Sequence, residues 1–291
     1  MTAIESYGFD SNEKLLIIHA DDVGMCHSVN RATFEAFHRG ILSSCSLMIP
    51  CPWIMEAVEF FKENTHYDYG IHSTLTSEWK FYRWGPITPK EKVPTLIDDQ
   101  GYLWSNASEA AKARVEEVET ELRAQVKRSL SFGLRPSHLD THMGVIYRRP
   151  DFLRAYIKVA IDYNLKPMLV KLSSEIAREA IREMKVKIPK GLILEMEKLG
   201  VPLLDELYTK IPGLSLQEKV KGFRSILTKL RAGTITQVIV HLGFDNEELK
   251  AIIRGKHYIE RYLDYKLITS PEALKLIEEF NVTLISWRDL K

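Results

Sequence analysis

The chain has 291 residues, of which 45% are hydrophobic and 27% are charged, a balance typical of folded globular proteins and not of disordered or fibrous ones. Its 40 lysine and arginine residues oppose 39 aspartate and glutamate residues, and the net charge of +1 excludes a strongly basic protein that binds nucleic acid or an anionic membrane. Folding at this length buries roughly 75% of the surface of the unfolded chain, so the core needs no structural metal and a bound metal would serve chemistry.

The cysteines and the N-terminal residues indicate the cellular compartment. Cys26, Cys45 and Cys51 form neither an even set for disulfides nor a C-x-x-C motif, which favours a reducing compartment. Residues 1–12 contain no basic residue and no apolar run, and no segment reaches the roughly 18 apolar residues of a membrane span. We therefore expect a cytoplasmic protein.

Short apolar runs rich in Val, Ile and Leu alternate with stretches of helical period, a pattern typical of a parallel sheet covered by helices. In chain order, the first half is predicted to contain a strand at 15–20, a helix at 28–39, a strand at 41–49, a helix at 53–64, a strand at 67–75 and a helix at 109–132. The second half is predicted to contain a strand at 136–141, a helix at 151–163, a strand at 166–172, a strand at 236–241, helices at 247–265 and 271–280, and a closing strand at 282–287. These strands fit either a doubly wound sheet or a closed or incomplete βα barrel.

Two long segments depart from this alternation. Residues 76–106 combine prolines and glycines with aromatic residues and are too long for a simple connection, which indicates a functional loop or lid. Residues 173–230 are predicted to form a mostly helical insertion that covers one side of the sheet or makes an oligomer contact, for example in a homodimer. No inert linker divides the chain, so we expect a single domain over residues 1–291.

Polar side chains follow the predicted strands at the points where the strands end. Because the carboxyl ends of parallel strands face one rim, such residues should converge although they lie far apart in the chain. They are Asp21 and Asp22 after the first strand, His72 in the third, Asp140 and His142 in the fourth, and His241 after the late strand.

The adjacent carboxylates of Asp21 and Asp22 need a positive partner, because burying an unpaired charge is strongly unfavourable. A metal ion would satisfy them, with one carboxylate on the ion and its neighbour facing the reacting water. The alternative is that the pair caps the helix that begins near Ser28.

The segment 137–142 carries a stronger signal than an isolated histidine. Alternation in an extended chain puts His138, Asp140 and His142 on one face, and three such residues are seldom pure packing. A lone histidine such as His72 is more often a hydrogen-bonded structural residue. One carboxylate with two imidazoles suits zinc, although carboxylate-rich sites also hold magnesium or manganese.

At this point four segments resemble a known family. The run Leu-Leu-Ile-Ile-His-Ala-Asp-Asp-Val-Gly at 15–24 resembles the opening motif of the YdjC-like carbohydrate deacetylases, in which an apolar strand leads into Ala-Asp-Asp-Phe-Gly. Asn30 and the Gly-Ile at 40–41 are similar to the family's next segment. The Gly-Ile-His at 70–72 with the Leu-Thr at 75–76 and the segment 136–142 are similar to its later motifs, in the same order.

The resemblance implies a deformed or incomplete TIM-like (β/α) barrel in one domain. It also implies a metal-dependent hydrolase that removes the N-acetyl group from an acetylated amino sugar or short oligosaccharide. Carried over position by position, it makes Asp22, His72 and His142 the ligands of one divalent ion, zinc or magnesium, and Asp21 the general base.

The chain also departs from the family pattern. The His-Leu-Gly at 241–243 keeps the histidine and glycine of the family's His-Pro-Gly and lacks its proline. Val23 replaces the phenylalanine of the first motif, and His19 stands where the family usually has asparagine. His19 is close enough to the Asp pair in sequence to tune its protonation.

Other residues receive roles in the resulting mechanism. His241 would protonate the departing amine. Asp140, with His138 beside it, would lie behind the ligands. There Asp140 would accept a hydrogen bond from a ligand imidazole and fix its tautomer. The alternative is that Asp140 caps the end of the strand. Trp79 and Trp84 would bind the substrate by packing on sugar rings, or else would anchor the loop or form a dimer contact.

Two competing functions stay open. Asp and His ligands on a barrel rim also serve other metal-dependent hydrolases of amides or phosphoesters, although no Walker or G-x-G-x-x-G motif is present. A non-catalytic sugar-binding protein is the third reading, but such a protein would gain nothing from a second desolvated carboxylate. The expected partner is a small N-acetylated carbohydrate, and neither a nucleic acid nor a membrane.

Overall fold

The computed structural model describes residues 4–174, 179 and 189–290. The strands are β1 (Lys14–Val23), β2 (Ser44–Leu47), β3 (Tyr69–Ser73), β4 (His138–Thr141), β5 (Lys166–Pro167), β6 (Glu206–Tyr208), β7 (Thr234–His241) and β8 (Val282–Leu284). The α-helices are α1 (His27–Arg39), α2 (Ile54–Glu63), α3 (Ala107–Ala110), α4 (Val115–Ser131), α5 (Pro150–Asp162), α7 (Lys190–Lys198), α8 (Leu216–Thr228), α9 (Glu247–Ile252), α10 (His257–Ile268) and α11 (Pro271–Glu279). Short 3-10 helices are η1 (Glu5–Tyr7), η2 (Lys90–Lys92), η3 (Pro94–Leu96) and η4 (His142–Arg148).

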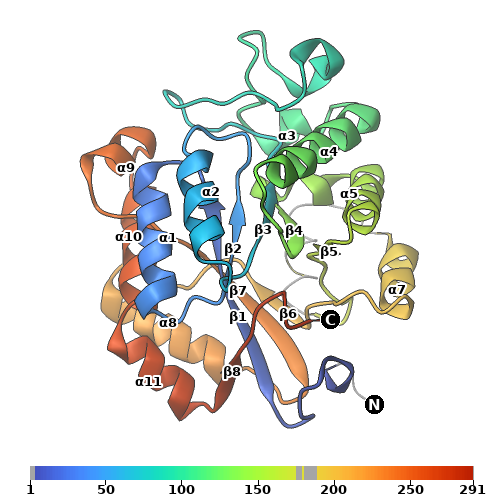
Figure 1. Ribbon diagram of the computed structural model, residues 1–291. Helices are drawn as coiled ribbons and strands as arrows, with labels where there is room; N and C mark the ends of the chain where they lie inside the picture. The colour runs from blue at the N-terminus through green and yellow to red at the C-terminus, as the bar shows by residue number, and fades with distance from the viewer. Residues whose placement is uncertain (1–3, 175–178, 180–188, 291) are drawn as a thin grey trace.

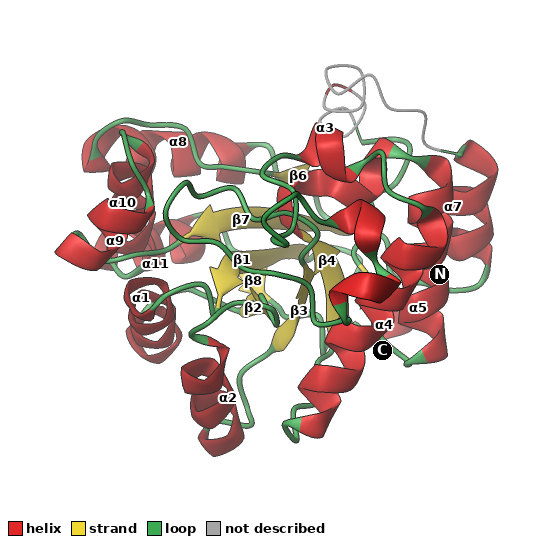
Figure 2. Ribbon diagram, turned by 90° about the horizontal axis from the view of Figure 1, so that it is seen from above, coloured by secondary structure: helices red, strands yellow, loops and turns green. Residues whose placement is uncertain are grey.

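The strands form one parallel sheet in the order β5-β4-β3-β2-β1-β7-β6. β8 pairs with the first residues of β1, and β2 pairs with β1 only from His19 onward. The strands lie at the centre with the helices around them (Figure 2). A single parallel bridge, between Val170 and Leu204, lies near the two edge strands, so the curled sheet is an incomplete barrel. This confirms the predicted deformed or incomplete TIM-like barrel.

The alternation along β1 explains why the barrel is apolar at one end and polar at the other. Leu15 and Ile17 pack in an inner cluster, while Leu16, Ile18 and Ala20 pack on the other side, against the helices. Successive side chains of a strand point to opposite faces, so His19 and Asp21 continue the inner row above Ile17. The same row that fills the base of the barrel therefore ends in a histidine and a carboxylate.

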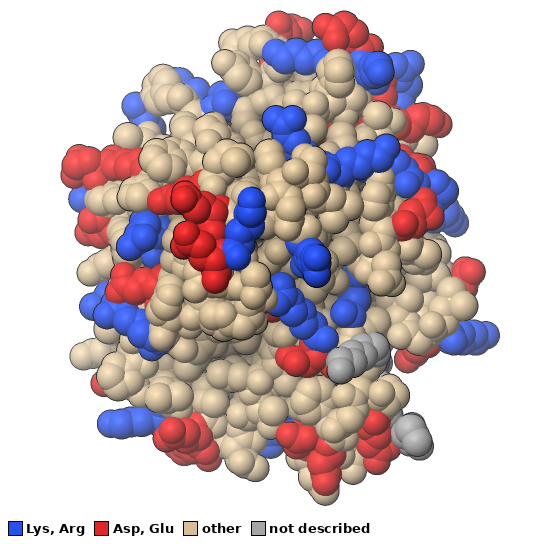
Figure 3. All heavy atoms as spheres, in the orientation of Figure 1, with Lys and Arg blue, Asp and Glu red and all other residues tan. Residues whose placement is uncertain are grey.

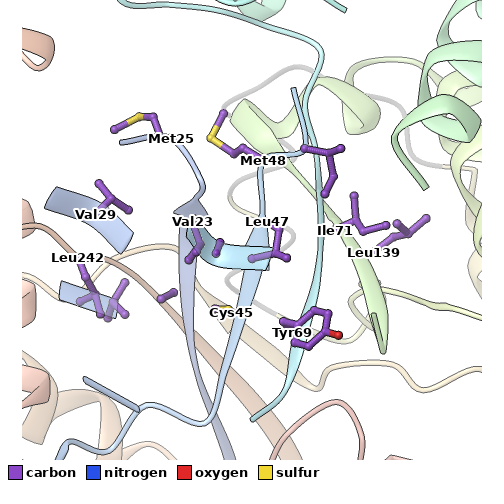
Figure 4. Packing of buried hydrophobic residues seen from close by; sticks show 14 of the residues in the cluster. Val23, Met25, Val29, Cys45, Leu47, Met48, Tyr69, Ile71, Leu139 and Leu242 are labelled. Atoms are coloured by element: carbon purple, nitrogen blue, oxygen red, sulfur yellow. The ribbon is translucent and has the colours of Figure 1, made fainter. Parts of the chain in front are cut away.

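The outer face of the sheet is held to the helices by aliphatic side chains in register. Leu47 on β2 pairs with Ile71 on β3, which pairs with Leu139 on β4, and all three are at most 1% exposed. Figure 4 shows them side by side on neighbouring strands. Full burial of each such side chain contributes about 1.5–3 kcal/mol, so this row fixes the strands whose other faces and ends carry the site.

The long segment 76–106 is anchored by a row of polar residues on α4. Glu117, Glu121 and Gln125 are spaced four residues apart and therefore share one helix face. Glu117 accepts hydrogen bonds from the backbone and hydroxyl of Thr95, Glu121 accepts from the backbone N–H groups of residues 87 and 88, and Gln125 bonds the backbone of residue 74. The segment is thus a fixed loop over the carboxyl end of the sheet (Figure 1).

Several predicted boundaries differ from the structure. The helix expected at 247–265 is two helices, α9 and α10, with Gly255 at φ +83° between them. The stretch 173–230, expected to be mostly helical, contains β6 between α7 and α8, and its residues 175–178 and 180–188 lie outside the described residues. The strand expected at 166–172 is reduced to Lys166–Pro167, because Pro167 has no N–H and β5 is an edge strand.

The surface agrees with the charge count. On the face drawn in Figure 3, basic and acidic side chains are interspersed. The three cysteines are buried and free, as expected of packing residues. Among the described residues, no helix has the length and apolar character needed to cross a membrane.

Candidate metal centre

Strand register brings the predicted site residues together at the carboxyl end of the sheet. Asp21 on β1 is opposite His241 on β7, and His72 on β3 is opposite Asp140 on β4. His142 begins η4, one residue after β4 ends. The convergence expected from parallel strand ends is therefore present in the structure.

An irregularity in β1 turns both adjacent carboxylates into this site. The register with β2 shifts between Ala20 and Val23, and Asp22 lies at φ +69°. Successive residues of a regular strand face opposite sides, whereas a bulge re-aims one of them. The turn that follows is fixed by Asn30, whose Oδ1 accepts a hydrogen bond from Gly24 N at 2.6 Å. The alternative role, a cap on α1, is not seen, because the N-cap is Cys26 and the first backbone N–H groups of the helix, at residues 27 and 28, donate to Glu248.

Three side-chain atoms form a compact triangle. Asp22 Oδ1 lies 3.1 Å from His142 Nδ1 and 3.4 Å from His72 Nε2, and the two imidazole nitrogens are 3.3 Å apart. Tetrahedral zinc with ligand bonds near 2.0–2.1 Å would place its ligands about 3.3 Å from one another. Asp22 Oδ1 is buried and has no hydrogen-bond partner among the described residues, which fits an atom aimed at a cation. The donor set therefore fits a divalent metal ion.

The second polar atom of each of these three side chains is also engaged. His72 Nδ1 lies 2.7 Å from Asp140 Oδ1, and His142 Nε2 lies 3.0 Å from Glu78 Oε2. Arg261 on α10 donates from Nη2 to Asp22 Oδ2 at 2.5 Å. All three side chains are thus held from behind.

Glu78 and Arg261 were missed by reasoning from sequence. Glu78 stands six positions after His72, so a search for acidic residues near the strand ends would have found it. Arg261 lies inside a helix 239 residues from Asp22, and nothing in its local sequence marks it.

The electrostatics of the metal-free site separate the two carboxylates. Burial raises the pKa of Asp21 to about 6, since the nearby His72 and His19 only partly oppose it. Burial acts in the same direction on Asp22, but Arg261 and the imidazoles of His142 and His72 outweigh it and hold its pKa well below the usual range. The pair therefore contains one firmly ionised carboxylate and one that exchanges a proton near neutral pH.

The two imidazoles of the triangle are shifted in the opposite sense. Burial alone would lower their pKa values, but Asp140 and Asp21 raise the pKa of His72 well above its usual range, and Glu78 and Asp22 raise that of His142 to about 9. The surrounding carboxylates thus favour positive charge at this place.

Beneath the triangle lies a second layer of buried polar side chains. His19 Nε2 lies 2.9 Å from Asp140 Oδ2 and 3.4 Å from Asp21 Oδ1, so Asp140 contacts both His19 and His72. His138 lies deeper, with its ring stacked on Trp287 at 5.2 Å and edge-on to His19 at 5.1 Å. The structure thus places Asp140 behind His72, while His138 packs against the layer below.

His241 lies beside the carboxylate pair at the cavity. Its Nε2 is 3.8 Å from Asp21 Oδ2, and its side chain is 37% exposed. Partial burial of the ring, then the cationic side chains of Arg261, His72 and His142, lower the pKa of His241 below its usual range despite Asp22. His241 is therefore neutral at pH 7 in the metal-free site.

A cavity of about 920 Å³ opens onto these residues, near the upper end of the range of about 300–1,000 Å³ typical of small-molecule sites. Trp79 lines it and donates from Nε1 to the Met25 sulfur. Trp84 does not line it, since its side chain is 3% exposed and its Nε1 donates to Thr76 O at 2.8 Å. Of the two aromatic residues, one therefore faces the cavity and the other is packed within the loop.

An incomplete parallel βα barrel with an Asp-His-His cluster at its carboxyl rim defines a class of candidate metal-dependent enzymes. Within that class, residues 15–279 match the family described as YdjC-like protein, and the chain belongs to this family. The resemblance drawn from the four motifs is therefore confirmed.

Relatives and a solved structure match nearly the whole chain. A carbohydrate deacetylase of Thermoanaerobacter pseudethanolicus is 28% identical over 96% of this chain and 100% of its own length. A chitooligosaccharide deacetylase of Yersinia enterocolitica is 28% identical over 95% of this chain and 99% of its own. A crystal structure from Enterococcus faecalis V583, provisionally described as a cellobiose-phosphate cleavage protein, has a TM-score of 0.78 at 26% identity and covers 96% of this chain and 99% of its own.

Proposed function

We propose that the chain is a metal-dependent hydrolase that removes the N-acetyl group from an acetylated amino sugar or a short oligosaccharide. The observation that carries the proposal is the carboxylate of Asp21, whose Oδ2 lies 3.8 Å from His72 Nε2, beside the triangle of Asp22, His72 and His142 at one end of a large cavity. A binding protein gains nothing from such a carboxylate, whereas a hydrolase needs a base there. The names of the relatives support the same reaction.

Asp22, His72 and His142 would hold the ion through Oδ1, Nε2 and Nδ1. One carboxylate with two imidazoles favours zinc, and magnesium is the second candidate. The ion, when bound, supplies Lewis acidity toward the acetyl carbonyl and a lowered pKa for water. Asp140 and Glu78 keep the two imidazoles turned toward it.

Asp21 is suited to the role of general base. Its pKa of about 6 is close to the value at which a carboxylate is both ionised at neutral pH and able to take a proton. Oδ2 lies 3.8 Å from His72 Nε2 and 3.8 Å from His241 Nε2, so it faces the triangle and is placed to accept the proton of the attacking water.

His241 is suited to the proton transfer that follows. Neutral His241 cannot donate a proton to the departing amine until it receives one, and Asp21 Oδ2, 3.8 Å from its Nε2, is a nearby source once Asp21 is protonated.

The cavity supports a carbohydrate substrate. The Trp79 ring at its wall offers a face on which the apolar side of a sugar ring can pack. We retain Trp79 for this role. The burial of Trp84 supports the alternative weighed from sequence, in which this residue anchors the loop.

The experiment is acetate release from a series of N-acetylated sugars, from the monosaccharide to short chitooligosaccharides. The protein is stripped of metal, and zinc, magnesium or manganese is restored. Release that requires metal and is lost in Asp21→Asn supports the proposal and ranks the substrates. Phosphate release from a sugar phosphate without acetate release would favour the alternative hydrolase, and a protein that binds no ion would favour the binding protein.

Two further expectations remain predictions. A homodimer would appear in the sedimentation velocity or light scattering of the purified protein. A cytoplasmic location would appear on fractionation of the source cells.

A further inference from the structure

His142 has two ring nitrogens, and the structure gives each a different environment. Nδ1 faces the triangle, at 3.1 Å from Asp22 Oδ1 and 3.3 Å from His72 Nε2. Nε2 points the other way and lies 3.0 Å from Glu78 Oε2. The His142 side chain is 5% exposed and that of Glu78 13%, so little solvent reaches the contact.

This contact decides which nitrogen of His142 is available to a metal ion. A carboxylate oxygen only accepts hydrogen bonds, so Nε2 must carry the hydrogen that joins it to Glu78. In the neutral ring, which is the form that binds a metal ion, the lone pair is then left on Nδ1, the nitrogen inside the triangle. Without Glu78, Asp22 Oδ1 would be the carboxylate oxygen beside the ring and would attract a hydrogen to Nδ1, where it blocks the ion.

We propose that Glu78 is a positioning residue of the metal centre, which holds His142 in the orientation and tautomer that bind a divalent cation. The inference rests on the proposed function, since it concerns the same metal site, and it assigns a residue that neither the motifs nor the strand ends indicated. Glu78 does not take the place of a ligand, because its carboxylate contacts Nε2, on the side of the His142 ring that faces away from the triangle.

The backbone around Glu78 is fixed, so its carboxylate is a stable support. Next to it, Ser77 donates from its backbone N–H to Trp104 O at 2.8 Å, and its hydroxyl accepts from the backbone of Trp84 at 2.9 Å. Thr76 O accepts from the Trp84 indole. Glu78 therefore connects the loop at 76–106 to the metal centre through one side chain.

The test compares Glu78→Ala and Glu78→Gln with Glu91→Ala, a control on the same loop whose side chain is exposed. Zinc affinity is measured by equilibrium dialysis on metal-stripped protein, and the unfolding temperature of each metal-free variant reports folding. Loss of such a hydrogen bond behind a ligand typically weakens metal binding by about 10–100-fold, which we expect for Glu78→Ala. Glu78→Gln should recover most of the affinity, because its amide oxygen still accepts from Nε2.

The readout separates this inference from the proposed reaction, because it needs no substrate. The inference is supported if zinc affinity falls in Glu78→Ala, returns in Glu78→Gln and is unchanged in Glu91→Ala, while the metal-free unfolding temperatures stay alike. It is overturned alone if the wild-type protein binds zinc and releases acetate and Glu78→Ala binds zinc equally well. Wild-type protein that binds no divalent ion would overturn this inference together with the metal dependence of the proposed function.

Discussion

Replacing Asp21 by asparagine should separate activity from stability, because the carboxylate is costly to the fold. Burial raises the pKa of Asp21 from its usual value near 3.8 to about 6 when no metal ion is bound. At 1.36 kcal/mol per pKa unit, the difference between about 6 and 3.8 corresponds to about 3 kcal/mol of lost stability when the group is ionised in both states. Asparagine has nearly the same shape and no charge, so Asp21→Asn removes this loss.

The effect has a definite dependence on pH. A folded-state pKa above the unfolded one means that the folded protein binds the proton more tightly, so stability falls as pH rises from 3.8 through about 6. The advantage of Asp21→Asn over the wild type should therefore be about 3 kcal/mol at pH 8 and roughly half of that at pH 5. Urea unfolding of both proteins in the presence of a chelator, at several pH values, measures it.

The same variant should lose its reaction without losing its metal. Asp21 is proposed as the base and not as a ligand, so zinc affinity should stay close to that of the wild type while kcat falls by about 10²–10⁴-fold. Normal turnover would refute the assignment of the base. A destabilised variant at pH 8, or a stability difference independent of pH, would refute the electrostatic reasoning.

Three further predictions concern the surrounding residues. Asp140→Leu should weaken zinc binding and lower the free energy of unfolding by about 2–6 kcal/mol, because two buried imidazoles lose their acceptor. Asp140→Asn keeps one acceptor oxygen and should lose less of both. Equal zinc affinity and equal unfolding curves in the two variants would contradict this prediction. His241→Ala should lower kcat with zinc affinity unchanged, and unaltered steady-state kinetics would make His241 structural. Trp79→Ala should raise KM with little change in the unfolding temperature, whereas Trp84→Ala should lower the free energy of unfolding by about 3–5 kcal/mol. The reverse pattern would assign substrate binding to Trp84 and loop packing to Trp79.

The sequence was most informative where local pattern and tertiary role agree. The run at 15–20 alternates between two apolar environments and lies wholly within β1, and the polar residues at the strand ends do meet at one rim. β1 extends to Val23, beyond the predicted end at residue 20, with a register shift at the Asp pair. A pattern of residue types does not reveal such an irregularity.

Elements set by tertiary contact were harder to predict. β6 is three residues long and only half-buried, so it carries no alternating pattern of its own, and its place is set by pairing with β7. The break between α9 and α10 is not predicted by the sequence, because one glycine within a helical period is weak evidence for the end of a helix. The residues that hold the ligands were missed for a similar reason, since their roles depend on elements far apart in the chain.

Arg261 shows how the last part of the chain completes a site begun by the first strand. α10 packs against both α1 and β7, and Gly243 permits the approach, because a Cβ there would lie 2.7 Å from the Leu249 side chain and 3.4 Å from Arg261 Cβ. From α10, Arg261 occupies Asp22 Oδ2 and leaves Oδ1 to the triangle. The arginine thus would leave Asp22 one oxygen for an ion held by the triangle. The glycine of the His-Leu-Gly at 241–243 therefore matters because it allows α10 to approach.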